Sequence, residues 1–159
     1  MAVACPICSL HRQAASGGSY AMGRGALWLL RHHGDPAPLA GWLLLDARRH
    51  LPGPLAFNDA EAASWGLALR GSSQLVRELT GCDRVYAIGF GEGTPHLHVH
   101  LIPRCTGDPS SAAWAVADLY RAVERGERAP ADPAEVAALV ARGRQLLASH
   151  PVPGIPAYP

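Results

Sequence analysis

Residues 96–102 read His-Leu-His-Val-His-Leu-Ile. Polar and apolar residues alternate strictly in this stretch, and successive side chains of a β-strand point to opposite faces of the sheet. The alternation therefore predicts a strand over residues 96–102, which Pro103 should end. One face would carry the three imidazoles of His96, His98 and His100, and the other would carry the core residues Leu97, Val99 and Leu101.

Three imidazoles on one strand face admit two chemical interpretations. They are the ligands of an all-histidine metal site, or they are a nucleophilic histidine flanked by residues that orient it. Spacing alone does not decide between these two. A third interpretation, solvent-facing histidines without a role, is disfavoured because rings about 6.6 Å apart would repel one another when protonated.

Outside this stretch, two apolar runs and one alternating segment predict strands. Two of them, residues 26–30 and 41–45, are separated by a turn and are expected to pair as a hairpin. The third, residues 84–90, is followed by a turn that leads into the histidine-rich strand.

Three segments predict helices. Residues 58–80 begin with a capping box, in which Asn58 is the N-cap and Glu61 the third helical residue, and they end before Gly81. Residues 112–124 and 133–148 also have helical composition, the latter with Asp132 as N-cap and Pro133 at the first position. Together, these elements predict an α+β protein with a core unit over residues 1–110, a helical extension over 111–150 and a mobile Pro-rich tail over 151–159.

Composition narrows the class of protein further. The 159 residues are 48% hydrophobic and 17% charged, which fits one compact domain. A net charge of +1 does not indicate the basic surface that binds a nucleic-acid polymer. The sequence has no lysine, which excludes Schiff-base chemistry on a lysine amine. The chain shows neither a signal peptide nor an apolar run long enough for a membrane, so we expect a cytoplasmic protein.

Residues 94–104, Thr-Pro-His-Leu-His-Val-His-Leu-Ile-Pro-Arg, resemble the signature of the histidine triad superfamily. The closing Pro-Arg is similar to the diadenosine polyphosphate hydrolase branch of that superfamily. Residues 41–50 resemble its second strand and basic turn, and residues 58–80 lie where its central helix lies. The resemblance covers about residues 5–105 and implies an antiparallel sheet of about five strands with a central helix.

The resemblance also implies an activity. His98, the middle histidine, would attack the α-phosphorus of a nucleoside phosphoanhydride, such as a dinucleoside polyphosphate, or of a phosphoramidate. Water would then hydrolyse the nucleotidyl-histidine intermediate. His100 would orient His98 and contact phosphate, and His96 lies on the other side of the nucleophile. The leaving group is left open.

Four further residues are candidates for substrate binding. Arg104 and the Thr94 hydroxyl are available donors to phosphate oxygens. Trp42 stands where many family members carry a histidine, and it either belongs to the core or presents a stacking surface to a base. His32 is our candidate for the ribose contact. Because of Trp42, a nucleotide-binding module with decayed catalysis is the alternative to an enzyme.

Cys5-Pro6-Ile7-Cys8 places two thiols at a spacing that can share one tetrahedral zinc ion, with a redox pair or two plain thiols as the alternatives. Many bacterial relatives join such a pair to two histidines whose places His50 and His96 match. The resemblance therefore implies a structural zinc site made of Cys5, Cys8, His50 and His96. A catalytic zinc held by His96, His98 and His100 is a further hypothesis, and the resemblance also implies a homodimer unless the late helices cover that surface.

Overall fold

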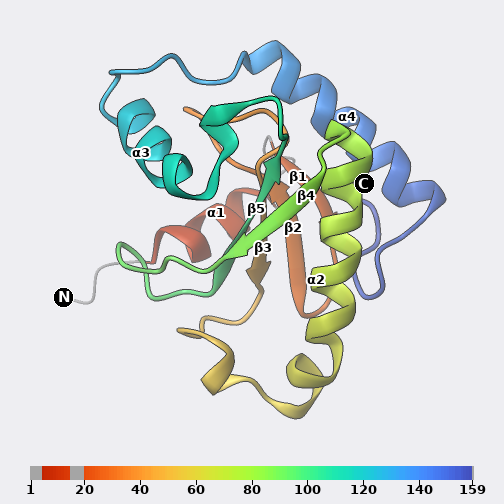
Figure 1. Ribbon diagram of the computed structural model, residues 1–159. Coiled ribbons are helices and arrows are strands. Elements are labelled where there is room, and N and C mark those ends of the chain that lie inside the picture. The colour runs from red at the N-terminus through yellow and green to blue at the C-terminus, as the bar shows by residue number, and fades with distance from the viewer. Residues whose placement is uncertain (1–4, 15–19, 159) are drawn as a thin grey trace.

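The computed structural model describes residues 5–14 and 20–158, and these residues hold one antiparallel sheet of five strands (Figure 1). Residues 1–4, 15–19 and 159, which fall in the predicted core unit and tail, lie outside this description. The strand order is β1-β2-β3-β5-β4. The strands are β1 (Ala21–Arg24), β2 (Trp28–His32), β3 (Leu43–Ala47), β4 (Arg84–Ile88) and β5 (His98–Arg104).

The register of the central strands assigns each residue to a face. Leu101 and Val99 of β5 lie opposite Leu43 and Leu45 of β3, and antiparallel partners project to the same face. This face is apolar. The alternate positions of the same two strands pair His100 with Leu44 and His98 with Asp46, so the second face carries the polar chemistry.

Two helices cover the apolar face (Figure 1). Helix α2 (Asp59–Thr80) begins with the predicted capping box and ends at Gly81, whose φ of 69° is the left-handed conformation that glycine adopts readily. Helix α4 (Pro133–Ser149) packs beside it and against β1. The approach to β1 is close, because a Cβ on Gly143 would lie 2.2 Å from the Cε of Met22.

The second face is covered by helices α1 (Pro6–Ala14) and α3 (Ala113–Glu124). A separate apolar cluster lies beneath α3, where Val116 packs against Trp42 and Ile102. Two short 3-10 helices, Pro54–Ala56 and Pro109–Ser111, lie in the connections before α2 and α3. This face therefore combines a polar strand surface with a helical cover.

The C-terminal segment packs onto the fold. Val152 and Ile155 are buried in the main core, and the backbone N–H of Tyr158 donates to the carbonyl of Met22 at 2.8 Å. Another bond joins the N–H of Arg24 to the carbonyl of Pro156 at 2.9 Å. The prediction of a mobile tail is therefore wrong for residues 151–158, because these contacts attach it to β1.

The predicted fold class is confirmed, and so is the antiparallel pairing of the two early apolar strands. Three of the strands, β2, β3 and β5, each begin and end two residues later in the chain than predicted. Strand β1 and helix α1 were not predicted. Within residues 5–14 and 20–158, no helix has the length and hydropathy that a membrane crossing requires.

Candidate active site and metal site

Two histidines of β5 open onto a cavity of about 390 Å³. The rings of His98 and His100 lie side by side, with centroids 5.3 Å apart. Residues 90–94, in the connection between β4 and β5, form one wall of the cavity, and helix α3 forms another. The side chains from α3 are Ala117, Tyr120, Arg121 and Glu124.

His98 is held in one tautomer by the backbone. Its Nδ1 lies 2.6 Å from the carbonyl oxygen of His96. Since a carbonyl oxygen only accepts hydrogen bonds, Nδ1 carries the hydrogen and donates it. The Nε2 of the neutral ring therefore keeps a free lone pair, which is what a nucleophilic imidazole requires.

His100 lies deeper among aromatic rings. The indole N–H of Trp42 donates to its Nδ1 at 3.0 Å, and the ring of Phe90 lies edge-on with its centroid 5.0 Å away. Burial and the nearby His98 lower the pKa of His100 to about 3, with smaller contributions from His33 and Arg31. His100 is consequently neutral at physiological pH.

His96 departs from the predicted arrangement. Strand β5 begins at His98, so His96 precedes the strand and its ring does not join the other two imidazoles. Its Nε2–H donates to the carbonyl of Ala47 at 2.7 Å. Its Nδ1 lies 3.4 Å from the sulfur of each of Cys5 and Cys8.

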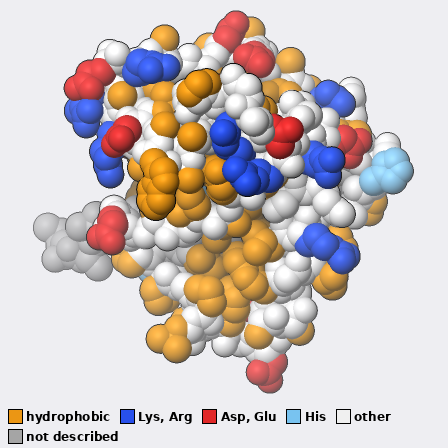
Figure 2. Space-filling view, in the orientation of Figure 1, with side chains coloured by type: hydrophobic (Ala, Val, Ile, Leu, Met, Phe, Trp, Pro, Cys, Tyr) orange, Lys and Arg blue, Asp and Glu red, His pale blue; other side chains and the backbone are white. Residues whose placement is uncertain are grey.

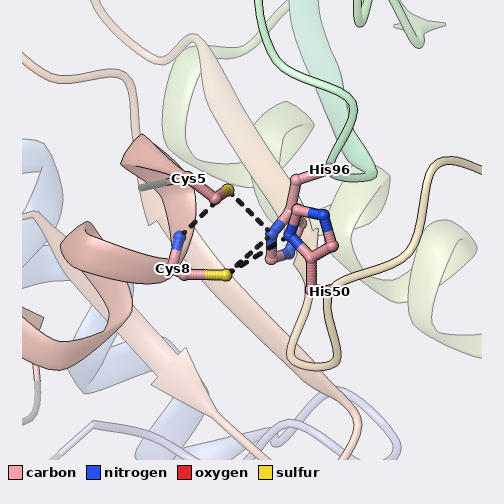
Figure 3. Close-up of side chains that lie close together, drawn as sticks. All are labelled: Cys5, Cys8, His50 and His96. Atoms are coloured by element: carbon pink, nitrogen blue, oxygen red, sulfur yellow. Dashed lines mark hydrogen bonds between the residues drawn. The ribbon is translucent and has the colours of Figure 1, made fainter. Parts of the chain in front are cut away.

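Figure 3 shows the four side chains of Cys5, Cys8, His50 and His96 converging from three separate segments. Their ligand atoms all lie within 4.8 Å of one another. Cys5 directly precedes α1, and the N–H of Cys8 approaches its sulfur at 3.5 Å. The first turn of the helix therefore places both thiols on one side, where His50 completes the group at 3.5 Å from the sulfur of Cys8.

This group fits a tetrahedral zinc ion. Bonds of about 2.3 Å to sulfur and 2.0–2.1 Å to nitrogen separate neighbouring ligands by roughly 3.3–3.8 Å. The sulfur-to-nitrogen distances of 3.4 and 3.5 Å agree with that range. The bond from His96 to Ala47 holds the lone pair of Nδ1 toward the sulfurs, as an outer partner of a zinc ligand does. Burial and Cys5 raise the pKa of the Cys8 thiol, and a bound zinc ion would favour its thiolate.

Of the four predicted substrate-binding residues, the structure places only Thr94 in the wall of the cavity. Trp42 is fully buried, so it belongs to the core and offers no stacking surface to a base. Arg104 is half-buried and donates to the carbonyl oxygens of Cys105 and Asp108 and to the hydroxyl of Ser111, so it braces the chain that leads to α3.

The prediction of His32 as a ribose contact is corrected. His32 lies opposite Leu43 in the register of β2 and β3, on the apolar face and away from His98. Its Nε2 accepts a hydrogen bond from the N–H of Gly41 at 2.9 Å. The prediction is wrong by one residue, and in an extended chain one residue moves a side chain to the opposite face. The next residue, His33, lies on the side of the cavity histidines, with its ring centroid 6.2 Å from that of His100.

A buried ion pair beneath α1 was also missed. The carboxylate of Asp46 accepts from Arg31 Nε at 2.6 Å and contacts His11 Nε2 at 3.0 Å. Although burial alone would raise it, the pKa of Asp46 is lowered to about 2 because Arg31 and His11 lie beside it. The available signal was a charged residue directly after each of two apolar runs, at Arg31 and Asp46, which the strands continue through.

No protein-family model matches the sequence, and no curated protein matches it. Solved structures do match. A histidine triad protein from Bradyrhizobium japonicum is 23% identical, with a TM-score of 0.60 over 83% of this chain and 92% of that one. A zinc-bound histidine triad family protein from Mycobacterium smegmatis is 18% identical, with a TM-score of 0.61 over 92% and 96% of the two chains. A hypothetical histidine triad nucleotide-binding protein from Sulfolobus tokodaii is 14% identical, with a TM-score of 0.62 over 92% and 97%. The chain therefore has the α+β fold of the histidine triad proteins.

Proposed function

We propose that this chain is an enzyme of the histidine triad superfamily that transfers a nucleotidyl group to His98 and then to water. The substrate class is a nucleoside phosphoanhydride, such as a dinucleoside polyphosphate, or a nucleoside phosphoramidate. The observation that carries the proposal is the tautomer of His98. Because the carbonyl of His96 holds its Nδ1–H, the free lone pair of Nε2 lies beside the cavity.

The reaction has two balanced steps. The lone pair of His98 Nε2 forms a bond to the α-phosphorus, and the bond from phosphorus to the leaving group breaks with its electron pair. Nδ1 keeps its hydrogen throughout, and the carbonyl of His96 stabilises the positive charge that the ring gains. In the second step a water oxygen bonds to phosphorus and the N–P bond breaks, with its electron pair returning to Nε2, so that His98 is neutral again as the nucleoside monophosphate leaves. The water gives up one proton to solvent, and solvent supplies the proton that the departed leaving group takes up.

The cavity supports a nucleotide as the bound group. Its volume of about 390 Å³ lies in the range of small-molecule sites. Phe90 and Tyr120 supply aromatic surface on two sides, and the Thr94 hydroxyl and the backbone N–H groups of Gly91 and Gly93 are donors for phosphoryl oxygens. The phosphate-binding role proposed for the Thr94 hydroxyl thus rests on the position of Thr94 in the cavity wall.

The same proposal assigns a structural zinc ion to Cys5, Cys8, His50 and His96. Four protein ligands leave no open position for substrate, which is typical of structural sites. The zinc-bound relative from Mycobacterium smegmatis supports the choice of metal. A catalytic zinc shared by His96, His98 and His100 has no such support, because His96 faces the two cysteines rather than His98.

The test is to trap the intermediate. Wild-type protein is incubated with adenylated substrates of both classes and quenched without acid, and an alkaline digest is read by mass spectrometry for an adenylyl group on His98. His98→Ala should show no adduct and should lower kcat at least about 10⁴-fold, because the nucleophile itself is removed. His150→Ala, which changes an exposed histidine outside the cavity, should retain both the adduct and the turnover.

Two results would count against the enzyme. Binding of adenine nucleotides without turnover of either substrate class, and without an adduct, would favour the binding module with decayed catalysis. Loss of bound metal from His98→Ala, with metal retained after replacement of Cys5 and Cys8, would favour the catalytic zinc.

A further inference from the structure

Trp42 acts on the site through a single directed contact. The residue lies just before β3 and is fully buried, with Ile102 and Val116 packed against it. Its indole Nε1–H points at Nδ1 of His100 over 3.0 Å, and the two rings meet edge-on at 79° with centroids 5.7 Å apart. Trp42 therefore reaches His100 but not the cavity.

The chemistry of the indole restricts this contact to one direction. An indole nitrogen donates a hydrogen bond and cannot accept one, so Nδ1 of His100 must present a lone pair to it. A neutral imidazole has only one N–H, and the hydrogen of His100 is then on Nε2. A histidine at position 42 could either donate or accept, so its residue type alone would not fix the tautomer of His100.

The surroundings of His100 keep the ring neutral and leave Nε2 available. The titratable and charged groups that face it are His98 on its own strand, Arg31 on β2, His33 directly after β2, Asp46 on β3 and Tyr120 on α3. Burial, with smaller contributions from His98, His33 and Arg31, lowers its pKa to about 3. Among residues 5–14 and 20–158, Trp42 is the hydrogen-bond partner of the His100 ring, at Nδ1. The Nε2 of His100 has no partner among these residues, and the ring lines the cavity.

We propose that Trp42 is a positioning residue that fixes His100 as the Nε2–H tautomer, so that His100 donates a hydrogen bond to an oxygen of the substrate. His98 and His100 then lie side by side as opposite tautomers. His98 carries its hydrogen on Nδ1 and offers a lone pair from Nε2, whereas His100 carries its hydrogen on Nε2 and offers a donor. The part of this inference that concerns substrate rests on the proposed function, and the part that concerns the tautomer does not.

The tautomer is measured directly by long-range ¹H–¹⁵N NMR of protein labelled with ¹⁵N-histidine. The signals of His100 are assigned by their loss in His100→Asn. In wild type we expect Nδ1 of His100 to have the shift of an unprotonated nitrogen and Nε2 that of a protonated one. Trp42→Phe removes the donor and keeps an aromatic ring, so a measurable fraction of the hydrogen should move to Nδ1.

Trp28→Phe is the matched control. Trp28 is also fully buried and also donates its indole N–H at 2.9 Å, but to the hydroxyl of Ser64 on helix α2. It should leave the spectrum of His100 unchanged. If substrate is turned over, Trp42→Phe should lower kcat about tenfold or more with a smaller change in KM, because a misplaced donor affects the transition state more than binding.

Two outcomes overturn the inference. One is a wild-type spectrum in which Nδ1 of His100 carries the hydrogen, and this measurement decides even when Trp42→Phe does not fold. The other is a spectrum of His100 that does not change in Trp42→Phe. Wild type with the expected tautomer but without an adduct on His98 would instead refute the proposed function and leave the positioning of His100 by Trp42 standing.

Discussion

The surroundings of His33 and His100, whose ring centroids lie 6.2 Å apart, keep these two histidines neutral. Burial lowers the pKa of His33 to about 4, although its bond to the carbonyl of Gly34 opposes the shift. Burial and His98 lower the pKa of His100 to about 3. An unfolded histidine has a pKa of about 6.5, so between that value and the folded pKa the unfolded chain binds more protons than the folded one. In that window the stability must rise with pH.

We therefore expect the free energy of unfolding to increase between about pH 4 and pH 6.5, by up to ~1.4 kcal/mol per pH unit for each of the two histidines. Urea denaturation across this range measures the slope. His33→Gln should make it shallower, and His150→Gln, which changes an exposed histidine, should not. Equal slopes in wild type and His33→Gln would show that His33 is not held neutral by folding.

At the scale of single elements, helix α1 is attached to the sheet at two points. Cys8 at its start belongs to the proposed zinc site, and His11, one turn later, contacts the buried carboxylate of Asp46. Nine residues are too few for a helix that is stable in isolation. The helix is therefore held by its partners rather than by its own propensity, and the metal ligands should be the stronger of them.

This arrangement predicts about one equivalent of zinc per chain by elemental analysis. Cys5→Ser should lose that metal and lower the melting temperature, because the helix loses its anchor. Cys105→Ser changes a partly buried cysteine outside the group and should retain the metal. Zinc that stays bound in Cys5→Ser would contradict the assignment.

The elements that could be predicted from sequence are those with local signals. Helix α2 begins and ends where the capping box and Gly81 place it, and Asp132 caps α4 as expected. Strand boundaries were displaced where the signal was not local. The apolar run of β2 continues into Arg31 because a partner 15 residues away neutralises that charge inside the fold. Strand β5 continues through Pro103 because its pairing with β3 has already ended at Leu101, so the missing N–H breaks no bond there.

The candidate site divides in the same way. The proposed nucleophile and the two cysteines of the proposed zinc site lie in short motifs, and His50 and His96 were expected as zinc ligands from the family resemblance, whereas neither source predicts the walls of the cavity. Phe90 and Tyr120 come from a loop and a helix that approach His100 only after folding. Sequence periodicity does not predict such contacts. The role proposed for Trp42 likewise depends on a hydrogen bond to a residue 58 positions away.

At the scale of the whole molecule, the two edges of the sheet differ. Among the described residues, β1 is covered by the C-terminal segment through a bridge between Gly23 and Ala157, while the outer edge of β4 has no partner strand. Figure 2 shows hydrophobic side chains gathered beside α2, below β4. On α2 itself, Leu67 is 47% exposed. An uncovered strand edge next to apolar surface is suited to pairing with a second copy.

We accordingly predict a homodimer through β4 and α2. Light scattering after size-exclusion chromatography should give twice the mass of one chain. Combining Leu67→Glu with Ala87→Lys places charges on both elements and should give a monomer. Trp114→Ser removes an even more exposed apolar residue, from α3, and should leave the mass unchanged. A monomeric wild type would refute the prediction.

The convergence of Cys5, Cys8, His50 and His96 also has a topological consequence. The bonded partners are 42, 88 and 91 residues apart in the chain, so an ion held by all four closes long loops, as a disulfide would. Such a cross-link differs from a disulfide in being set by mass action. When free zinc is well above its dissociation constant, each tenfold rise in its concentration adds ~1.4 kcal/mol to the free energy of unfolding. The concentration of free zinc around the protein would then set the fraction of chains that are folded at equilibrium.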